Sequence, residues 1–222
     1  MRRRRGRTAL VTNLRFAVES ARVEPYAVVP GVVLRLKITE DSQAPVQAIA
    51  LRAQVQIEPR RRRYDADEER GIVELFGAPN RFGDTLRSVV WAHVSVMVLA
   101  FTGETYVDVP LPCSYDFEVA AHKYLHAMRD GDIPLTLLFS GTVFTRGENG
   151  FAPEFVPWSC EATYRLPVRL WREAVEANFP NSAWLRVNRD VFGELYRFKT
   201  ERGLPSWDAT LEALLGTAVA PT

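Results

Sequence analysis

The sequence has few cysteines and no long uninterrupted apolar run. Cys113 and Cys160 are the two cysteines among 222 residues, and no export signal follows the N-terminal arginines, so we expect no disulfide framework. The longest apolar stretch, SVVWAHVSVMVLAF, is interrupted by a histidine and two serines. It is also shorter than the roughly 20 residues of a membrane span. We therefore expect a cytoplasmic protein with no membrane span.

The common catalytic motifs are missing as well. The sequence contains no glycine-rich phosphate loop, no C-x-x-C pair and no G-x-S-x-G nucleophile elbow. These absences predict no catalytic residue and no cofactor. An enzyme of an unrecognised class stays an alternative, because its site could be assembled from residues that are distant in the sequence.

The charges are almost balanced, but they are unevenly distributed. The chain has 28 basic and 27 acidic residues, which gives a net charge of +1. Five arginines lie in the N-terminal MRRRRGR, and without them the remainder carries a net charge of −4. Proteins that grip phosphates usually carry their positive charge on the folded body, so we do not expect nucleic acid as a partner. We interpret residues 1–11 as a disordered arginine-rich extension, or as the product of a misassigned start with Val11 as the initiator.

Alternating apolar and polar residues dominate the first two thirds of the chain. NLRFAVES, GVVLRLKIT and VQAIALRAQVQIE all show the period of two that is typical of antiparallel strands with one wet face. SVVWAHVSVMV is apolar at both parities, which predicts a strand buried on both faces. ETYVDVPLPCSY, with its prolines, indicates an edge strand, and IPLTLLFSGTVFT a strong strand. Residues 12–166 are therefore expected to form a mainly β domain.

One run of charge interrupts this pattern, in IEPRRRRYDADEERGIVELFG. Asp65 is a good helix N-cap, Glu68 lies three residues on in capping-box position, and Gly77 is a suitable stop. These signals predict a short helix near residues 65–76. We interpret Arg60–Arg63 as its solvated entry loop. The positive charge of that loop would be cancelled locally by the acids that follow, which are Asp65, Asp67, Glu68 and Glu69.

The segment AAHKYLHAM suits either a helix or a strand, and we leave residues 120–128 open between the two. In a helix, His122 and His126 share one face at a spacing that can chelate zinc or nickel, and Cys113 lies nearby in the sequence. In a strand, the two histidines would lie about 13 Å apart, too far to share an ion. The glutamate of the zincin motif is missing, so these three residues are weak metal candidates.

The chain changes character near residue 167. PVRLWREAVEANF, NRDVFGELYRFKTERG and SWDATLEALL have helical spacing of their apolar residues, with Gly203 as the stop of the second. We expect residues 167–216 to form a helical segment packed on the same core. Many strands followed by helices define the α+β class. The expected architecture is an antiparallel β-sandwich or strongly curved sheet, followed by C-terminal helices packed against it.

The sequence also resembles an actinobacterial family of unknown function. The resemblance covers nearly all of the chain from Leu14 onward. It is carried by VEPYAVVPGVVLRLKI, PCSYDFEVAAHKYLHAM, IPLTLLFSGTVFTRGENGF, RLPVRLWREAVEANFPNSAWLRV and LPSWDATLEALL. Genes of this family often lie near those of uptake [NiFe] hydrogenases, which implies a role in hydrogenase assembly, maturation or regulation. The resemblance also implies a residue other than histidine at the position of His122, which weakens the metal alternative.

The function expected from these observations is that of a non-catalytic accessory protein that binds another protein. A metal-binding or metal-delivery protein and an enzyme of unrecognised class remain as alternatives.

Overall fold

The computed structural model describes residues 13–24, 29–113, 120–147, 150–178, 180 and 185–219. The extension expected over residues 1–11, and its alternative start at Val11, lie outside the described residues. The chain divides into two compact units, one up to Ser182 and one from Ala183 onward.

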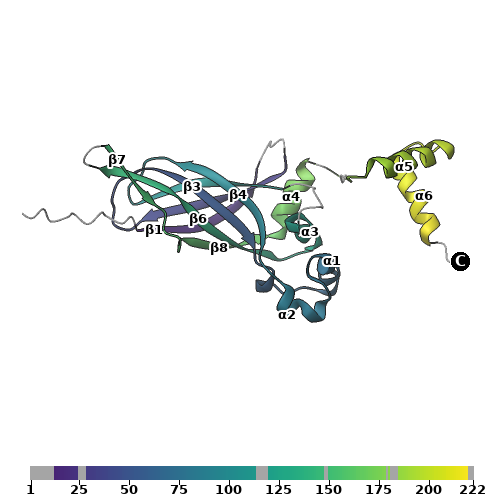
Figure 1. The fold of residues 1–222 in the computed structure, drawn as a ribbon, viewed down its shortest axis with the longest axis horizontal. Coiled ribbons are helices and arrows are strands. Elements are labelled where there is room, and N and C mark those ends of the chain that lie inside the picture. The colour runs from purple at the N-terminus through teal and green to yellow at the C-terminus, as the bar shows by residue number, and fades with distance from the viewer. Residues whose placement is uncertain are drawn as a thin grey trace, which may run out of the picture. The chain divides into compact units, whose positions relative to one another are not determined.

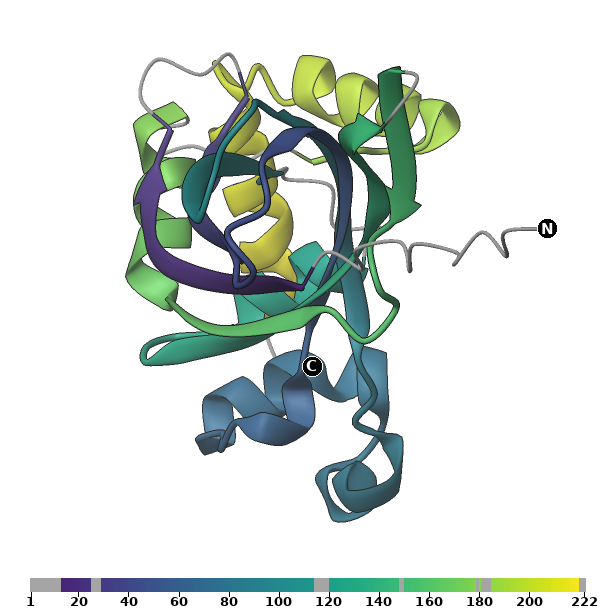
Figure 2. The ribbon, with the colours of Figure 1, turned by 90° about the vertical axis from the view of Figure 1, so that its left-hand side faces the viewer.

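Eight strands of the first unit form two antiparallel sheets. The first sheet has the order β1-β2-β5 and the second the order β4-β3-β6-β7, with β8 pairing with β6 as well. The strands are β1 (Leu14–Val23), β2 (Gly31–Glu40), β3 (Val46–Ile57), β4 (Val89–Val98), β5 (Glu104–Pro112), β6 (Asp132–Gly147), β7 (Gly150–Phe155) and β8 (Glu161–Pro167). The sheets curve around one another (Figures 1 and 2). This arrangement confirms the predicted α+β class and antiparallel sandwich.

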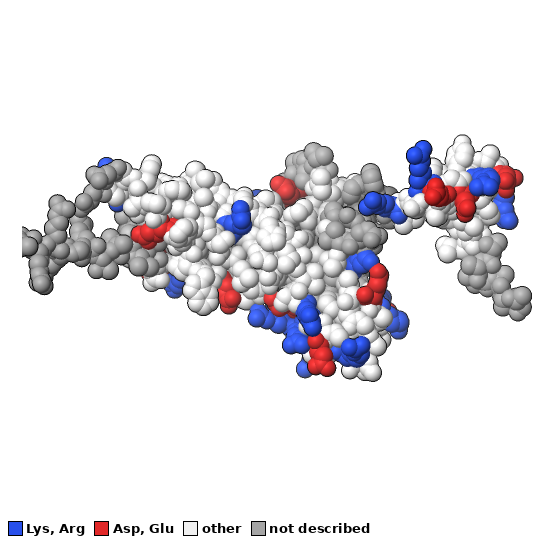
Figure 3. Space-filling model, in the orientation of Figure 1, with Lys and Arg blue, Asp and Glu red and all other residues white. Residues whose placement is uncertain are grey.

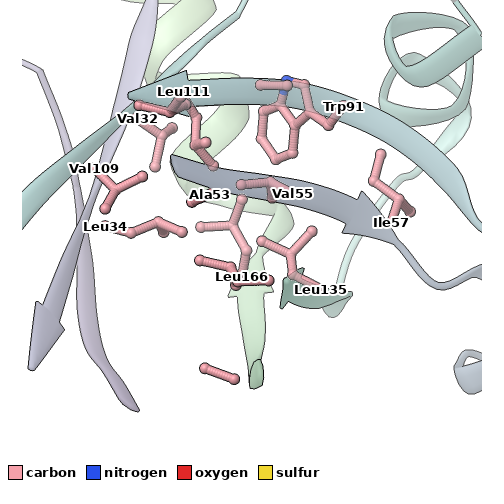
Figure 4. Close-up of a cluster of buried hydrophobic side chains, with 14 of the residues drawn as sticks. Val32, Leu34, Ala53, Val55, Ile57, Trp91, Val109, Leu111, Leu135 and Leu166 are labelled. Carbon is pink, nitrogen blue, oxygen red and sulfur yellow. The ribbon is translucent and has the colours of Figure 1, made fainter. Parts of the chain in front are cut away.

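The core lies between the two sheets and is built by the alternation seen in the sequence. β2 and β5 contribute Val32, Leu34, Val109 and Leu111, while β3 contributes Ala53, Val55 and Ile57 from the opposite sheet (Figure 4). The Trp91 ring of β4 closes one side of this core, and its indole N–H donates to the Pro112 carbonyl at 3.0 Å. The predicted edge position of β5 is confirmed, since β5 pairs with β2 alone.

The prediction that β4 is buried on both faces is wrong. β4 lies at the edge of its sheet, and the side chains of Val90 and Met97 are exposed on its outer face. Apolar residues at both parities predicted double burial, but the exposed positions of β4 are Val90, His93, Ser95 and Met97, and the register with β3 shifts between Val90 and Ala92. The outer face of this sheet therefore carries apolar side chains that lack a covering layer among the described residues.

β6 is the longest strand, and it holds two partners in succession on one edge. Its first half pairs with β8 and its second half with β7, while β3 pairs along its other edge. Gly141 lies where β8 gives way to β7, with φ of +143°. A Cβ there would meet the Ala50 carbonyl oxygen of β3 at 2.1 Å. The close pairing of β3 and β6 therefore requires glycine at this position.

The connection between β3 and β4 is helical. It contains the 3-10 turns η1 (Pro59–Arg61) and η2 (Pro79–Arg81), the helix α1 (Ala66–Phe76) and the short α2 (Phe82–Thr85). The predicted helix and its capping box are confirmed: the Asp65 side chain accepts from the N–H groups of Asp67 and Glu68, and Glu68 reaches back to the Asp65 N–H. Gly77 ends α1 at φ of +78°.

The segment left open between helix and strand is a helix, α3 (Ala120–Ala127), which packs on α1. Tyr124 of α3 is fully buried, and its hydroxyl lies 2.9 Å from that of Tyr64, which in turn donates to the Pro59 carbonyl at 2.7 Å. Edge-to-face contact with Phe76 completes this aromatic junction. The junction fixes α1, α3 and η1 relative to one another.

The three predicted C-terminal helices are present as α4 (Val168–Asn178), α5 (Arg189–Glu201) and α6 (Trp207–Val219). α4 belongs to the first unit, where it packs on β1, β2 and β8, and the division between the two units falls after Ser182. α5 and α6 form the second unit. That they pack on the core of the first unit stays a prediction. In the described part of the chain, no helix has the length and apolar character needed to cross a membrane.

Candidate functional surfaces

The arginine run after β3 separates into two pairs with different roles. Arg60 donates to the carbonyls of Leu86 and Gly83, at 2.7 and 2.8 Å. Arg62 donates to the carbonyls of Asp132 and Asp130, at 2.8 and 2.7 Å, and forms an ion pair with Glu68. Arg60 therefore ties η1 to the end of the helical insertion, and Arg62 holds the insertion against the start of β6.

The expected local cancellation of the arginine run is found only in part. Glu68 pairs with Arg62, but Asp65 caps α1, and Asp67 pairs with Arg70 and Arg129 outside the run. Within the described residues, Arg61 and Arg63 have no hydrogen-bond or ion-pair partner for their guanidinium groups. The loop expected to be solvated thus contains one buried arginine, Arg62, and two outward-facing arginines with uncompensated charge.

An open depression lies beside this run. Its volume is about 550 Å³, and five arginines and one aspartate line it together with Gly131: Arg60, Arg61, Arg62, Arg63, Arg165 and Asp132. In the orientation of Figure 1, basic residues gather close to α1 and α2, with a few acidic residues among them (Figure 3). Arg165 comes from β8, so a residue that is distant in the sequence adds to the charge of the run.

The three metal candidates lie in different surroundings. Cys113 follows β5 and is fully buried, and burial raises the pKa of its thiol to about 12. His122 is buried in α3, whereas His126 is half-buried against the Trp171 ring, at 4.7 Å between centroids. Among the described residues, no three histidine, cysteine or acidic side chains form a group that could hold a metal. The structure therefore does not bring Cys113, His122 and His126 together as a ligand set.

His126 also borders an open depression of about 690 Å³ along α4, next to Trp171 and Arg172. Burial, with smaller contributions from the neighbouring His122 and Arg172, lowers the pKa of His126 to about 4. The imidazole is therefore neutral at physiological pH.

The second unit exposes much of its apolar surface. No residue of α5 is buried, and Phe192 and Tyr196 are 47% and 58% exposed although both contact the Trp207 ring of α6. The ring centroids of Phe192 and Trp207 lie 5.2 Å apart. Further exposed apolar side chains of this unit are Leu185, Val191, Leu211 and Leu215. We call these residues, with Phe192, Tyr196 and Trp207, the helical apolar surface.

A second apolar feature lies on the outer face of the larger sheet. A groove of about 470 Å³ crosses β4, β3 and β6, flanked by Met97 and by Phe155 of β7, with Ser95 and Ser140 also in its lining. The side chains of Met97 and Phe155 are 60% and 86% exposed. Sequence reasoning missed this groove because it assigned β4 to the interior.

Sequence reasoning also missed the arginine depression, because the contribution of Arg165 depends on the pairing of β8 with β6. The run itself was visible, but its division into carbonyl-binding and outward-facing members depends on the three-dimensional path of η1.

Together, these features define an α+β sandwich protein with a separate two-helix unit, whose prominent surfaces are apolar or basic. A family model described as a family of unknown function, DUF6084, matches residues 11–222, and the chain belongs to this family. No curated protein matches the sequence.

Structural similarity to solved proteins is weak. A beta-glucosidase from Kluyveromyces marxianus is 7% identical and matches 70% of this chain and 15% of its own, with a TM-score of 0.28. Beta-glucosidase 3B from Thermotoga neapolitana is 9% identical and matches 70% of this chain and 17% of its own, with a TM-score of 0.27. The chain thus spans less than a fifth of these enzymes, and the likeness carries no argument about its function.

Proposed function

We propose that this protein is a non-catalytic accessory protein that binds another protein through the helical apolar surface of α5 and α6. The observation that carries the proposal is the exposure of aromatic and aliphatic side chains on both helices, with no buried residue in α5. Contiguous exposed apolar side chains on a folded unit mark surfaces that associate with other polypeptides.

The size of the second unit supports this reading. It contains only the residues from Ala183 onward, and units of about 40 residues rarely bury enough apolar surface to offset the entropy lost on ordering. Thr210 of α6 is fully buried, but the rings of Phe192, Tyr196 and Trp207 retain large exposed areas. Contact with a partner would remove these rings from water and complete the small core. Aromatic residues are also the side chains most enriched in the energetic centres of protein interfaces.

The finer assignment is a role in the assembly, maturation or regulation of a [NiFe] hydrogenase in the cytoplasm. Its support is the family resemblance in the sequence. A partner of this kind would present an apolar groove or helix face that accepts the rings of α5 and α6.

An affinity pull-down of the tagged full-length protein from its native host, with partners identified by mass spectrometry, tests both levels of the proposal. The informative variant is Phe192→Ala/Tyr196→Ala, which removes two exposed aromatic rings from α5. The matched control is Phe151→Ala, which removes an exposed aromatic ring from β7 in the first unit.

We expect the wild type and the control to recover the same partner, and the α5 variant to lose most of it. Hydrogenase subunits or maturation factors among the partners would support the finer assignment, and unrelated proteins would contradict it. Equal recovery by all three proteins would refute the helical apolar surface as the binding site. Recovery of nothing above an untagged control would favour the metal and enzyme alternatives.

A further inference from the structure

The arginine depression is held in shape by two of its own arginines. Arg60 and Arg62 have their guanidinium groups engaged by four backbone carbonyls and by Glu68. Alternate residues of the run are thereby fixed against the body, and Arg61 and Arg63 between and after them are exposed. The structure therefore supports a display of positive charge on an ordered loop.

Arg165 extends this display across β8. A second open depression, of about 380 Å³, adjoins the first and shares Arg61 and Arg165 with it. Pro134, Leu135, Thr163 and Tyr164 also line it, and of these Pro134 and Leu135 are themselves buried. We call the two depressions together the arginine trough. It brings together three guanidinium groups that have no acceptor among the described residues, those of Arg61, Arg63 and Arg165.

We propose that the arginine trough binds a carboxylate-rich segment of a protein partner. A guanidinium presents its donors in a planar fork that matches the two oxygens of a carboxylate, and Arg61, Arg63 and Arg165 are placed to receive several such groups.

The charge of the rest of the protein favours an acidic peptide over nucleic acid. Outside the five arginines of the N-terminus the chain carries a net charge of −4, so the trough is a local positive site on a mildly acidic body. A polynucleotide would extend beyond the trough and meet that negative charge, whereas a short acidic segment would not. Asp132 also lines the trough, and it disfavours carboxylates that lie directly beside it. This inference is independent of the helical apolar surface, because the trough lies wholly within the first unit.

The test is the binding of a fluorescein-labelled hexaglutamate peptide to the full-length protein, measured by fluorescence anisotropy. The trough variant is Arg61→Ala/Arg165→Ala. The control is Arg52→Ala/Arg169→Ala, which removes the same number of positive charges from exposed positions on β3 and α4. The N-terminal arginines are present in all three proteins, so their contribution to peptide binding is common to all.

We expect the dissociation constant to rise about five- to tenfold in the trough variant, as the loss of two exposed ion pairs implies, and to change less than about twofold in the control. Raising the salt concentration should weaken binding by the wild type more than by the trough variant. Urea unfolding of each variant checks that exposed substitutions leave the fold intact.

Three outcomes would overturn the proposal. The first is an equal dissociation constant for the trough and control variants, which would place any binding elsewhere. The second is no saturable binding by the wild type. The third is tighter binding of a labelled single-stranded oligonucleotide, or of competing tripolyphosphate, than of the peptide, provided that this binding is lost in the trough variant. That third result would assign the trough to phosphates.

Discussion

Breaking the ion pair between Arg62 and Glu68 should destabilise the protein more than any other single charge removal near the arginine run. The two side chains are only 9% and 5% exposed, so neither charge is solvated when its partner is removed. Removing one partner of a buried pair typically costs about 3–5 kcal/mol, because the other charge is left uncompensated. Arg62→Ala also leaves the carbonyls of Asp130 and Asp132 without their donor.

The measurement is the free energy of unfolding by urea, followed by tryptophan fluorescence. We expect Arg62→Ala to lose about 3–5 kcal/mol, a large fraction of the 5–15 kcal/mol that holds a typical domain folded. Arg63→Ala, at the exposed neighbouring position, should stay within about 0.5 kcal/mol of the wild type. A loss below about 1 kcal/mol for Arg62→Ala would refute the reasoning, because it would mean that water reaches Glu68.

A double variant distinguishes the destabilisation caused by an unpaired buried charge from the destabilisation caused by lost hydrogen bonds. In Arg62→Met/Glu68→Leu no buried charge remains without a partner, so its destabilisation should be clearly smaller than the sum of the two single effects. The Arg129 N–H, which donates to Glu68 at 2.8 Å, still loses its acceptor. Additive effects within about 0.5 kcal/mol would contradict the assignment of the pair as a coupled unit.

Three further predictions concern the first unit. Burial opposes ionisation of Glu40, but hydrogen bonds from Ser42 and from backbone N–H groups outweigh this effect and lower the pKa of the carboxyl group. The stability that the carboxylate adds should therefore be complete above the ordinary pKa of 4.5 and should be lost as the pH falls below it. Urea titrations should show Glu40→Gln less stable than the wild type at pH 7 by about 1–3 kcal/mol, with the gap closing towards pH 3; a constant gap would contradict this. Thiol titration with Ellman's reagent should show Cys160 reacting before the buried Cys113, whose thiol pKa is raised to about 12, and Cys160→Ser should abolish the fast phase. Gly141→Ala should lower the midpoint of thermal unfolding by several degrees, because the added Cβ would overlap a backbone oxygen of β3. This shift corresponds to a loss of about 1–3 kcal/mol. An unchanged midpoint would show that β3 and β6 can separate at this position.

The fold could be predicted where one local signal dominated. β2 and β3 alternate cleanly because one face is buried and the other meets water, and α1 carries both halves of its capping box in the sequence. β4 was misassigned because apolar residues at both parities are typical of a strand buried on both faces. In the structure a register shift after Val90 exposes apolar residues of both parities, Val90 and Met97. The ambiguity of α3 was resolved by tertiary contacts, since Tyr124 packs against Tyr64 and Phe76.

The candidate surfaces were less predictable than the fold. The arginine run was conspicuous, but a count of neighbouring charges cannot show that Asp67 pairs with Arg129, which follows α3. Nor can it show that β8 brings Arg165 to the same depression. The sequence predicted that α5 and α6 pack on the core, because the spacing of apolar residues on a helix does not distinguish a core from a docking surface; that packing stays a prediction.

The order in which strands pair along the chain has a consequence for biosynthesis. β1 and β2 form a hairpin with local contacts, but β2 takes its second partner, β5, from roughly 70 residues further on. At about 5–20 residues per second, a nascent chain holds the outer edge of β2 open for roughly 4–15 seconds. Exposed strand edges of this kind can pair with the wrong chain. Chaperone dependence during synthesis, and aggregation when the chain is truncated before β5, are the expected signs of this delay.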